Sequence, residues 1–191
     1  MFKVVKMKDI IRIPPRMFSL PLEDSALTVL KENFEGRIIR DLGLIVSILD
    51  VDVEDIGKIA PGDGAVYHVA TFNALVFTPM LKEVVEGEVI TVEDFGLLVR
   101  IGPVDAFIHK SQIHDDYFSF SREQSAMLGS KTGRIVRKGD KVRARIVQVS
   151  YGGQAKILKI GLTMRQPYLG KIEWIEHDVR KAREAVKSGE T

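Results

Sequence analysis

From Lys82 onward, the chain consists of short strand-like runs separated by turn residues, and this pattern restricts its fold more than any other feature. Glu93-Asp94 and Gly102-Pro103 are turn signals between the first three runs. Five short strands with a longer insertion after the third predict a small closed or partly open β-barrel. The insertion, residues 114–131, is polar and is expected to be partly helical. The strand candidates are Val84–Val92, Gly96–Ile101, Ala106–His109, Lys141–Val149 and Lys156–Thr163.

The first 80 residues have a different pattern, with one helix among longer strands. An extended segment over Phe2–Ile13 ends at Pro14-Pro15, because proline lacks an N–H and restricts the residue before it. Ser19 and Pro21 mark the expected start of a helix, and Gly36, a residue suited to the left-handed turn after a helix, marks its expected end. Its buried face is predicted from apolar residues at helical spacing, namely Ala26, Leu27, Leu30 and Phe34.

Two more strands complete the pattern of this first part. The run Leu44–Leu49 is almost wholly apolar and continues into the alternating segment 50–53. The second run, Ala65–Thr78, is long enough that a bulge or kink is expected in it. Residues 61–64 form a turn signal between the two runs. One helix on a strongly bent antiparallel sheet is the predicted arrangement.

The predicted fold class is therefore α+β with mostly β structure. An N-terminal tip domain over residues 1–80 is expected to precede a five-stranded OB-fold barrel over residues 81–170, with a C-terminal helical tail over residues 171–191. In the tail, Ile175, Val179, Ala182 and Val186 recur at helical spacing. The pattern fits either a docking helix or a solvated, frayed end.

Composition excludes several classes of function. The sequence has no cysteine, which excludes disulfides and thiolate metal sites, and its four histidines have no metal-ligand spacing, so no metal or cofactor is expected. No apolar run is long enough to cross a bilayer, and the N-terminus lacks the apolar core of a signal peptide. We therefore expect a cytoplasmic protein that makes no membrane contact.

The formal net charge of +2 is too small for nucleic-acid binding by charge alone, but the charge is unevenly distributed. Between Lys131 and Arg145, seven basic residues stand against a single acid, Asp140. This stretch is either a basic face or an ordinary solvated surface, and charge alone does not decide between them.

Aromatic residues mark a candidate binding face on the predicted barrel. Phe95 begins the second strand, and Phe107 and His109 share one face of the third. Rings on adjacent strands can stack with unpaired bases, and nearby cations can contact phosphates. Spacing alone favours barrel core for an isolated phenylalanine, so that alternative stays open. The predicted phosphate contacts are Arg100, Lys110, Arg143 and Arg145.

Several short strings resemble the RNA-binding barrel named after ribosomal protein S1. The resemblance implies that Phe95, Phe107 and His109 face RNA. Two departures are Ala106, where the family usually has glycine, and Ser150, near the position of a frequent carboxylate. The matching residues are Gly87, Val89, Phe95, Gly96, Ile108, His109, Ser111, Gln112, Ile113, Lys138, Gly139, Asp140, Val142, Ala144 and Ile146.

Other strings, spread over nearly the whole chain, resemble the family of archaeal RNA polymerase stalk subunits called E-prime. They are Arg12-Ile-Pro-Pro15, Asp41-Leu-Gly-Leu44, Gly62-Asp-Gly-Ala65 with Tyr67-His68, and 162–171. The resemblance implies a non-catalytic subunit of DNA-directed RNA polymerase in transcription. It implies that the tip domain docks on the polymerase core and that the barrel contacts nascent single-stranded RNA. It also implies that the seam between tip and barrel binds the smaller polypeptide of the stalk heterodimer, which is called F.

The resemblance further implies which residues contact the core, and turn chemistry alone is the competing explanation for most of them. They are Pro14, Pro15, Ile59, Pro61, Gly62, Asp63 and Gly64. Proteins of RNA processing and translation use the same barrel, so an RNA-processing or translation-associated protein is the alternative function. A nuclease would need a separate catalytic domain, and the first 80 residues are short and lack a carboxylate cluster.

Overall fold

The computed structural model describes residues 1–152 and 157–188 and divides into two compact units. The core of the first unit is Met1–Thr78, and that of the second is Pro79–Ser150 with the chain from Lys159 onward. None of the helices in these described stretches is both long and apolar enough to span a bilayer.

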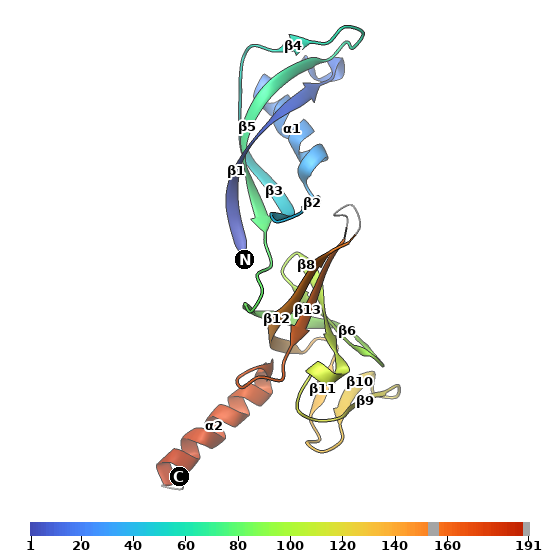
Figure 1. Ribbon diagram of the computed structural model, residues 1–191, viewed down its shortest axis with the longest axis vertical. Coiled ribbons are helices and arrows are strands. Elements are labelled where there is room, and N and C mark those ends of the chain that lie inside the picture. Colours follow the sequence, from blue (N-terminus) through green and yellow to red (C-terminus); the bar gives the residue numbers. More distant parts are fainter. Residues whose placement is uncertain (153–156, 189–191) are drawn as a thin grey trace. The chain divides into compact units, whose positions relative to one another are not determined.

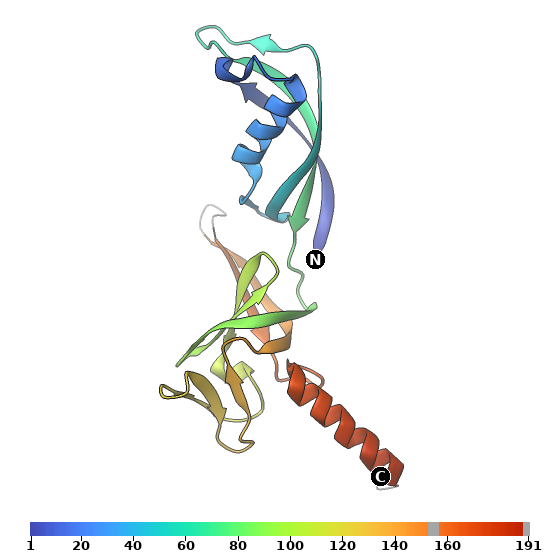
Figure 2. The same cartoon turned by 180° about the vertical axis from the view of Figure 1, so that it is seen from behind.

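The first unit is a bent antiparallel sheet with one helix on its face (Figure 1). Helix α1 (Leu22–Phe34) covers strands β1 and β3, as the reverse view in Figure 2 also shows. The strands follow the order β1-β5-β3-β2, and β4 pairs with the start of β5. Their bounds are β1 (Phe2–Ile13), β2 (Ile38–Ile39), β3 (Gly43–Val53), β4 (Lys58–Ile59) and β5 (Val66–Phe77), with a 3₁₀ turn η1 (Pro15–Met17) after β1.

The helix agrees with its sequence signals. Pro21 is the residue that caps its N-terminus, and the chain leaves the helix through Gly36, whose φ of 78° is left-handed. Ala26 and Leu30 are fully buried, and Leu27 and Phe34 pack against the same core. The predicted buried face is therefore confirmed, and Ser25 and Val29 extend it.

The expected bulge lies in a different strand from the predicted one. Strand β5 pairs with β1 without interruption, whereas β3 shifts register against β5 between Ile45 and Ser47 and again between Ile48 and Asp50. The extra residues in β3 let the sheet bend while β5 stays regular. One consequence is that Leu49, the last residue of the apolar run 44–49, is exposed.

The second unit contains the predicted barrel. Its strands are β6 (Val84–Glu93), β7 (Gly96–Ile101), β8 (Val104–His109), β12 (Lys141–Tyr151) and β13 (Leu158–Thr163). They pair in the order β13-β8-β7-β6-β12, and pairing of β13 with β12 closes the ring. The short strand β14 (Gly170–Lys171) pairs with the start of β12 and is not part of the ring. Alternate side chains such as Val89, Leu97, Ile108 and Ile146 are completely buried inside it.

The insertion after the third barrel strand is a small sheet, so the prediction that it is partly helical is wrong. Strands β9 (Phe118–Ser121), β10 (Ala126–Gly129) and β11 (Ile135–Arg137) pair in the order β11-β10-β9. Only the 3₁₀ turn η2 (Lys110–Gln112) precedes them. The polar composition concealed a period of two in Phe-Ser-Phe-Ser, where Phe118 is buried and Ser119 is exposed.

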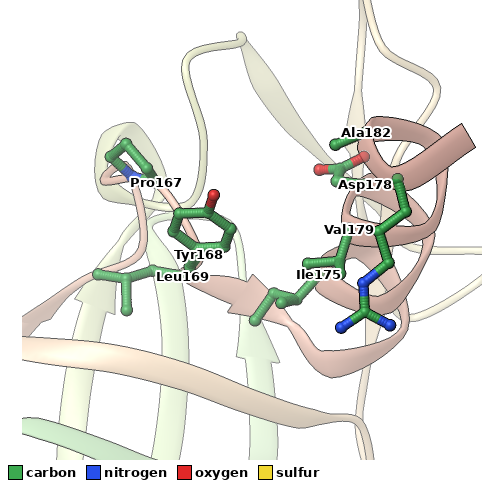
Figure 3. Close-up of a pocket in the computed structure, with 8 residues that line it drawn as sticks. Pro167, Tyr168, Leu169, Ile175, Asp178, Val179 and Ala182 are labelled. Carbon is green, nitrogen blue, oxygen red and sulfur yellow. The ribbon is translucent and has the colours of Figure 1, made fainter. Parts of the chain in front are cut away.

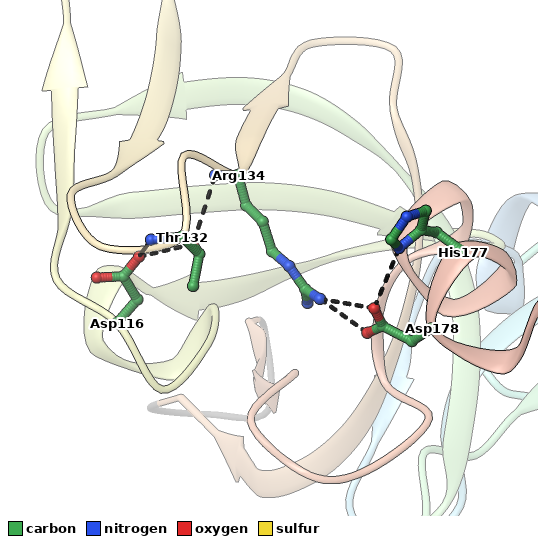
Figure 4. A network of polar contacts seen from close by, with 5 residues as sticks. All are labelled: Asp116, Thr132, Arg134, His177 and Asp178. Atoms are coloured by element: carbon green, nitrogen blue, oxygen red, sulfur yellow. Dashed lines mark hydrogen bonds and ion pairs between the residues drawn. The ribbon is translucent and has the colours of Figure 1, made fainter. Parts of the chain in front are cut away.

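Asp116 connects the two ends of this insertion (Figure 4). Its carboxylate accepts hydrogen bonds from the Thr132 hydroxyl at 2.7 Å, from the Thr132 amide at 2.9 Å and from the amides of Lys131 and Tyr117. These donors, the Thr132 hydroxyl foremost, lower the pKa of Asp116 to about 2.

Helix α2 (Ile172–Ser188) begins on the surface of the second unit. The Trp174 ring contacts the rings of His114 and Phe118, with centroids 6.3 and 6.4 Å away. The Arg134 guanidinium lies 5.2 Å from the Trp174 centroid and pairs with Asp178 at 2.8 Å (Figure 4). The start of the tail is thus docked, whereas its residues from Arg180 to Glu184 are exposed; the side chain of Val186 lies outside the described part.

We predict that removing the Thr132 hydroxyl reduces the acid dependence of stability. A carboxyl whose folded pKa is below its unfolded value of 3.8 stabilises the fold fully above that value, and loses this contribution as the pH falls toward 2. Urea unfolding between pH 5 and pH 2 should therefore show a shallower fall for Thr132→Val than for the parent. Thr132→Ser keeps the hydroxyl and should match the parent. Equal slopes for all three proteins would contradict this role.

Candidate RNA-binding face and docking surface

The pairing register of β7 and β8 brings the predicted aromatic residues together. Gly96 lies opposite His109, and Leu98 lies opposite Phe107. Because side chains alternate between faces, Phe107 and His109 point away from the barrel core, which Ala106 and Ile108 enter. Ala106 itself is buried, and the pairing passes through it without a register shift.

Three rings form one cluster on this face, which we call the platform (Phe95, Phe107 and His109). The Phe95 and Phe107 centroids are 5.7 Å apart, and those of Phe107 and His109 are 6.4 Å apart. Phe95 is 50% exposed and Phe107 is partly exposed, so neither ring belongs to the barrel core. Exposed rings at such spacing offer π-faces to unpaired bases.

Gly96 makes room for the platform. A Cβ at this position would lie 2.7 Å from Cζ of Phe107 and would also meet the carbonyl oxygen of Ile108. The Phe107 ring therefore lies across the glycine, which explains why the chain has no side chain there.

Backbone contacts fix the edge of the platform. The Lys110 amide donates to the Phe95 carbonyl at 3.0 Å, which connects the β6–β7 turn to the end of β8. Nδ1 of His109 accepts from the Ser111 amide at 3.2 Å and lies 2.8 Å from the Ser111 hydroxyl. The amide contact makes Nδ1 an acceptor, so a neutral His109 carries its proton on Nε2.

The predicted phosphate contacts differ in their surroundings. Arg100 lies on the platform side of β7 and pairs with Asp105 at 3.0 Å. Arg143 and Arg145 lie on β12, which β6 separates from β7, and Arg143 pairs with Glu86 of β6 at 2.8 Å. Nε of Arg145 is buried and has no hydrogen-bond partner among the described residues.

The basic stretch from Lys131 to Arg145 is therefore not one free surface. Arg134 is used by Trp174 and Asp178, and Arg143 is partly neutralised by Glu86. The sequence did not reveal these partners because they lie far from the stretch along the chain. Lys110 is the predicted cation that lies directly beside the platform, since it follows His109 in the chain.

The predicted core-docking residues lie together at one end of the first unit. Strand β1 ends opposite the start of β5, where β4 also pairs, and Gly64 lies next to Pro15. Pro14 and Pro15 begin η1, Ile59 lies on β4, and Pro61, Gly62, Asp63 and Gly64 form the turn before β5. We call this group of residues the tip end.

A polar network fixes the turn at the tip end. Asp63 accepts two hydrogen bonds of 2.7 Å from the Arg12 guanidinium, one of 2.7 Å from the Tyr67 hydroxyl and one from the Ala65 amide. The hydrogen bonds from Arg12 lower the pKa of Asp63 well below its usual range, and the hydrogen bond from Tyr67 lowers it further. Asp63 was predicted from its turn, whereas its partners Arg12 and Tyr67 were not predicted.

Apolar side chains are exposed around this fixed turn. Ile56 is 85% exposed and Ile59 is 72% exposed, and Phe18 and Leu20 are also exposed. Of these four residues, only Ile59 was a predicted docking residue. An isoleucine between Asp55 and Gly57, in a segment without strand or helix pattern, was the available signal for Ile56.

A groove of about 780 Å³ separates Tyr168 and Leu169 from Ile175 and Val179 of α2 (Figure 3).

Within the described residues, no group of three or more His, Asp or Glu side chains could hold a metal ion.

A closed five-stranded barrel with partly exposed rings on β8 and in the adjoining β6–β7 turn defines an RNA-binding barrel of the S1 class. The family model of the S1 RNA binding domain matches residues 78–161. The model of the SHS2 domain found in the N terminus of Rpb7p/Rpc25p/MJ0397 matches residues 8–64. The chain belongs to the Rpo7/Rpb7 family of DNA-directed RNA polymerase subunits, as its similarity to curated proteins shows.

The similarity extends along almost the whole chain. DNA-directed RNA polymerase subunit Rpo7 of Saccharolobus shibatae is 43% identical over 92% of this chain and 97% of the relative. Its counterpart in Sulfolobus acidocaldarius is 42% identical over 95% and 99%. DNA-directed RNA polymerase II subunit RPB7 of Saccharomyces cerevisiae is 28% identical over 90% and 100%. These relatives do not favour the alternative of an RNA-processing or translation protein.

We predict that Gly96→Ala destabilises the barrel by about 1–3 kcal/mol, because the new methyl group must displace the Phe107 ring and the paired strand. Gly64→Ala is the matched control, since its Cβ would lie 3.6 Å from Pro15, an ordinary contact. Chemical unfolding measured by circular dichroism compares the two. Equal stability of both variants would contradict the close approach at Gly96.

Proposed function

We propose that this chain is a non-catalytic stalk subunit of RNA polymerase that docks on the core, pairs with the F polypeptide in a stalk heterodimer and contacts nascent single-stranded RNA. The catalytic groups of the polymerase then lie on other subunits. The platform, with its partly exposed rings placed by Gly96, is the observation that carries the RNA-binding part of this proposal.

The chemistry of the platform favours single-stranded RNA. Stacking needs only an accessible base face, so it tolerates any sequence, as contact with a nascent transcript requires. The formal charge is only +2, so phosphate attraction adds little and stacking has to supply much of the affinity. Lys110, beside the rings, is the cation best placed to contact a phosphate.

The tip end supports docking on the core. Exposed isoleucine and phenylalanine side chains around a turn held by the Arg12–Asp63–Tyr67 network form an apolar surface on a fixed backbone. Such a surface loses little conformational entropy when a partner covers it. Pro14 and Pro15 restrict the neighbouring backbone further.

Other exposed apolar residues support a second partner, which we assign to the F polypeptide. Phe2 and Val4 are exposed on the edge strand β1, and Met80 and Leu81 are exposed in the segment that leads into β6. Exposed apolar side chains of this kind, here present on each unit, are typical of protein interfaces.

Loss of a platform ring should weaken RNA binding. Stacking contributes ~1–3 kcal/mol per base, so Phe95→Ala should lower the affinity for single-stranded RNA about tenfold or more. Lys110→Ala should reduce the slope of log affinity against log salt by about 0.7. Phe18→Ala, at an equally exposed phenylalanine of the first unit, is the control and should change neither quantity. Unchanged affinity in a folded Phe95→Ala protein would refute the platform.

The tip end should be needed for assembly but not for RNA binding. Ile59→Asp places a charge in the exposed apolar surface and should abolish co-purification with a polymerase core that lacks its own copy of this subunit. Phe95→Ala should show the reverse, with normal core association and weak RNA binding. A native extract in which the unmodified chain carries no polymerase subunits would overturn the assembly proposal.

A further inference from the structure

An open pocket of about 350 Å³ lies directly beside the platform. Its wall starts at His109 and Lys110 and continues through the segment before β9 to Lys131 and Arg165. A volume of this size is within the range of small-ligand sites, roughly 300–1,000 Å³. Because His109 belongs to both, the pocket is a continuation of the platform rather than a separate site.

The charges around the pocket favour an anion. Lys110 and Lys131 line it, and neither has an ion pair within the described residues. Asp116 also lines it and keeps its negative charge, but its oxygens accept hydrogen bonds from the Thr132 hydroxyl and three backbone amides. The lining residues carry three cations against two carboxylates. Asp115 pairs with Arg165 at 2.6 Å, so these two charges offset each other. The two lysines remain available to a phosphate.

Tyr117 gives the pocket an aromatic side chain on a fixed backbone. Its amide donates to Asp116, and its carbonyl accepts from both the amide and the hydroxyl of Ser130 at 2.9 and 3.0 Å. The side chain nevertheless stays 67% exposed. Because the backbone is already fixed, only the side-chain torsions of Tyr117 have to be ordered when its ring stacks with a base.

His114 adds an unused polar atom to the same wall. Its Nδ1 is buried and has no hydrogen-bond partner among the described residues. Burial lowers the pKa of His114, and Arg134 lowers it further, so the ring is neutral near pH 7. His114 therefore lines the pocket without adding a charge to it.

We infer that this pocket holds a further nucleotide of the single-stranded RNA whose neighbouring bases occupy the platform. The base stacks on Tyr117, and Lys110 and Lys131 contact the phosphates that connect it to the platform. The inference rests on the proposed RNA-binding function of the barrel. Tyr117 and Lys131 lie outside the β7–β8 face on which that function is based, whereas His109 is shared with it.

Two lengths of RNA distinguish the pocket from the platform. The experiment measures how the full chain binds two oligouridylates. Chemical-shift titration is used for the short RNA of three nucleotides, and fluorescence anisotropy for the long RNA of nine nucleotides. Tyr117→Ala should weaken the long RNA about tenfold and leave the short one unchanged, whereas Tyr117→Phe should retain parental affinity for both. Lys131→Ala should reduce the salt slope of the long RNA alone by about 0.7.

A matched control is available in the same unit. Tyr168 is 71% exposed and lines the groove beside α2 (Figure 3), so Tyr168→Ala should bind both RNAs as the parent does. Phe107→Ala should weaken both RNAs, because the platform takes part in each complex. Circular dichroism of each variant confirms that the barrel is folded.

Each outcome decides a different claim. If Phe107→Ala weakens both RNAs but Tyr117→Ala binds the long RNA normally, the pocket inference is overturned and the proposed function stands. If Tyr117→Ala and Tyr168→Ala lose affinity equally, the effect is not specific to the pocket and the inference is again overturned. If the parent binds neither RNA, the RNA-binding part of the proposed function fails together with the inference.

Discussion

Closure of the barrel is the constraint on which the rest of the second unit depends. Strand β13 pairs with β12 on one side and with β8 on the other, so the ring has no open edge. Once the ring is closed, the period of two along each strand decides which residues face outward. Phe107 and His109 are exposed for this reason, and the Phe95 turn is connected to them through the Lys110 amide.

The sequence predicted most strands and turns, since these follow from local patterns of apolar, proline and glycine residues. Helix α1 and the barrel strands agree with those patterns, as at Gly96–Ile101. The insertion was assigned by its polarity, which conceals the alternation from Phe118 onward. The bulges in β3 accompany the bend of the sheet, and no residue within Ile45–Asp50 signals them.

The candidate site could be predicted only as far as it depends on strand spacing. Phe107 and His109 share a face because they are two residues apart, and this placement was predicted. Partners that are distant in the chain were not, as the pairing of Arg134 with Asp178 across the unit demonstrates. The same holds for Arg12 and Asp63 at the tip end, where a turn residue gains its role from a distant strand.

Trp174 is the single tryptophan of the chain, and it lies where α2 begins. Its indole is surrounded by Arg134, His114 and Phe118, groups that belong to the insertion and to the segment before it. Departure of the helix from this position would expose the indole to water. The intrinsic fluorescence of the protein is therefore a built-in optical reporter of how α2 is seated, and no label has to be attached.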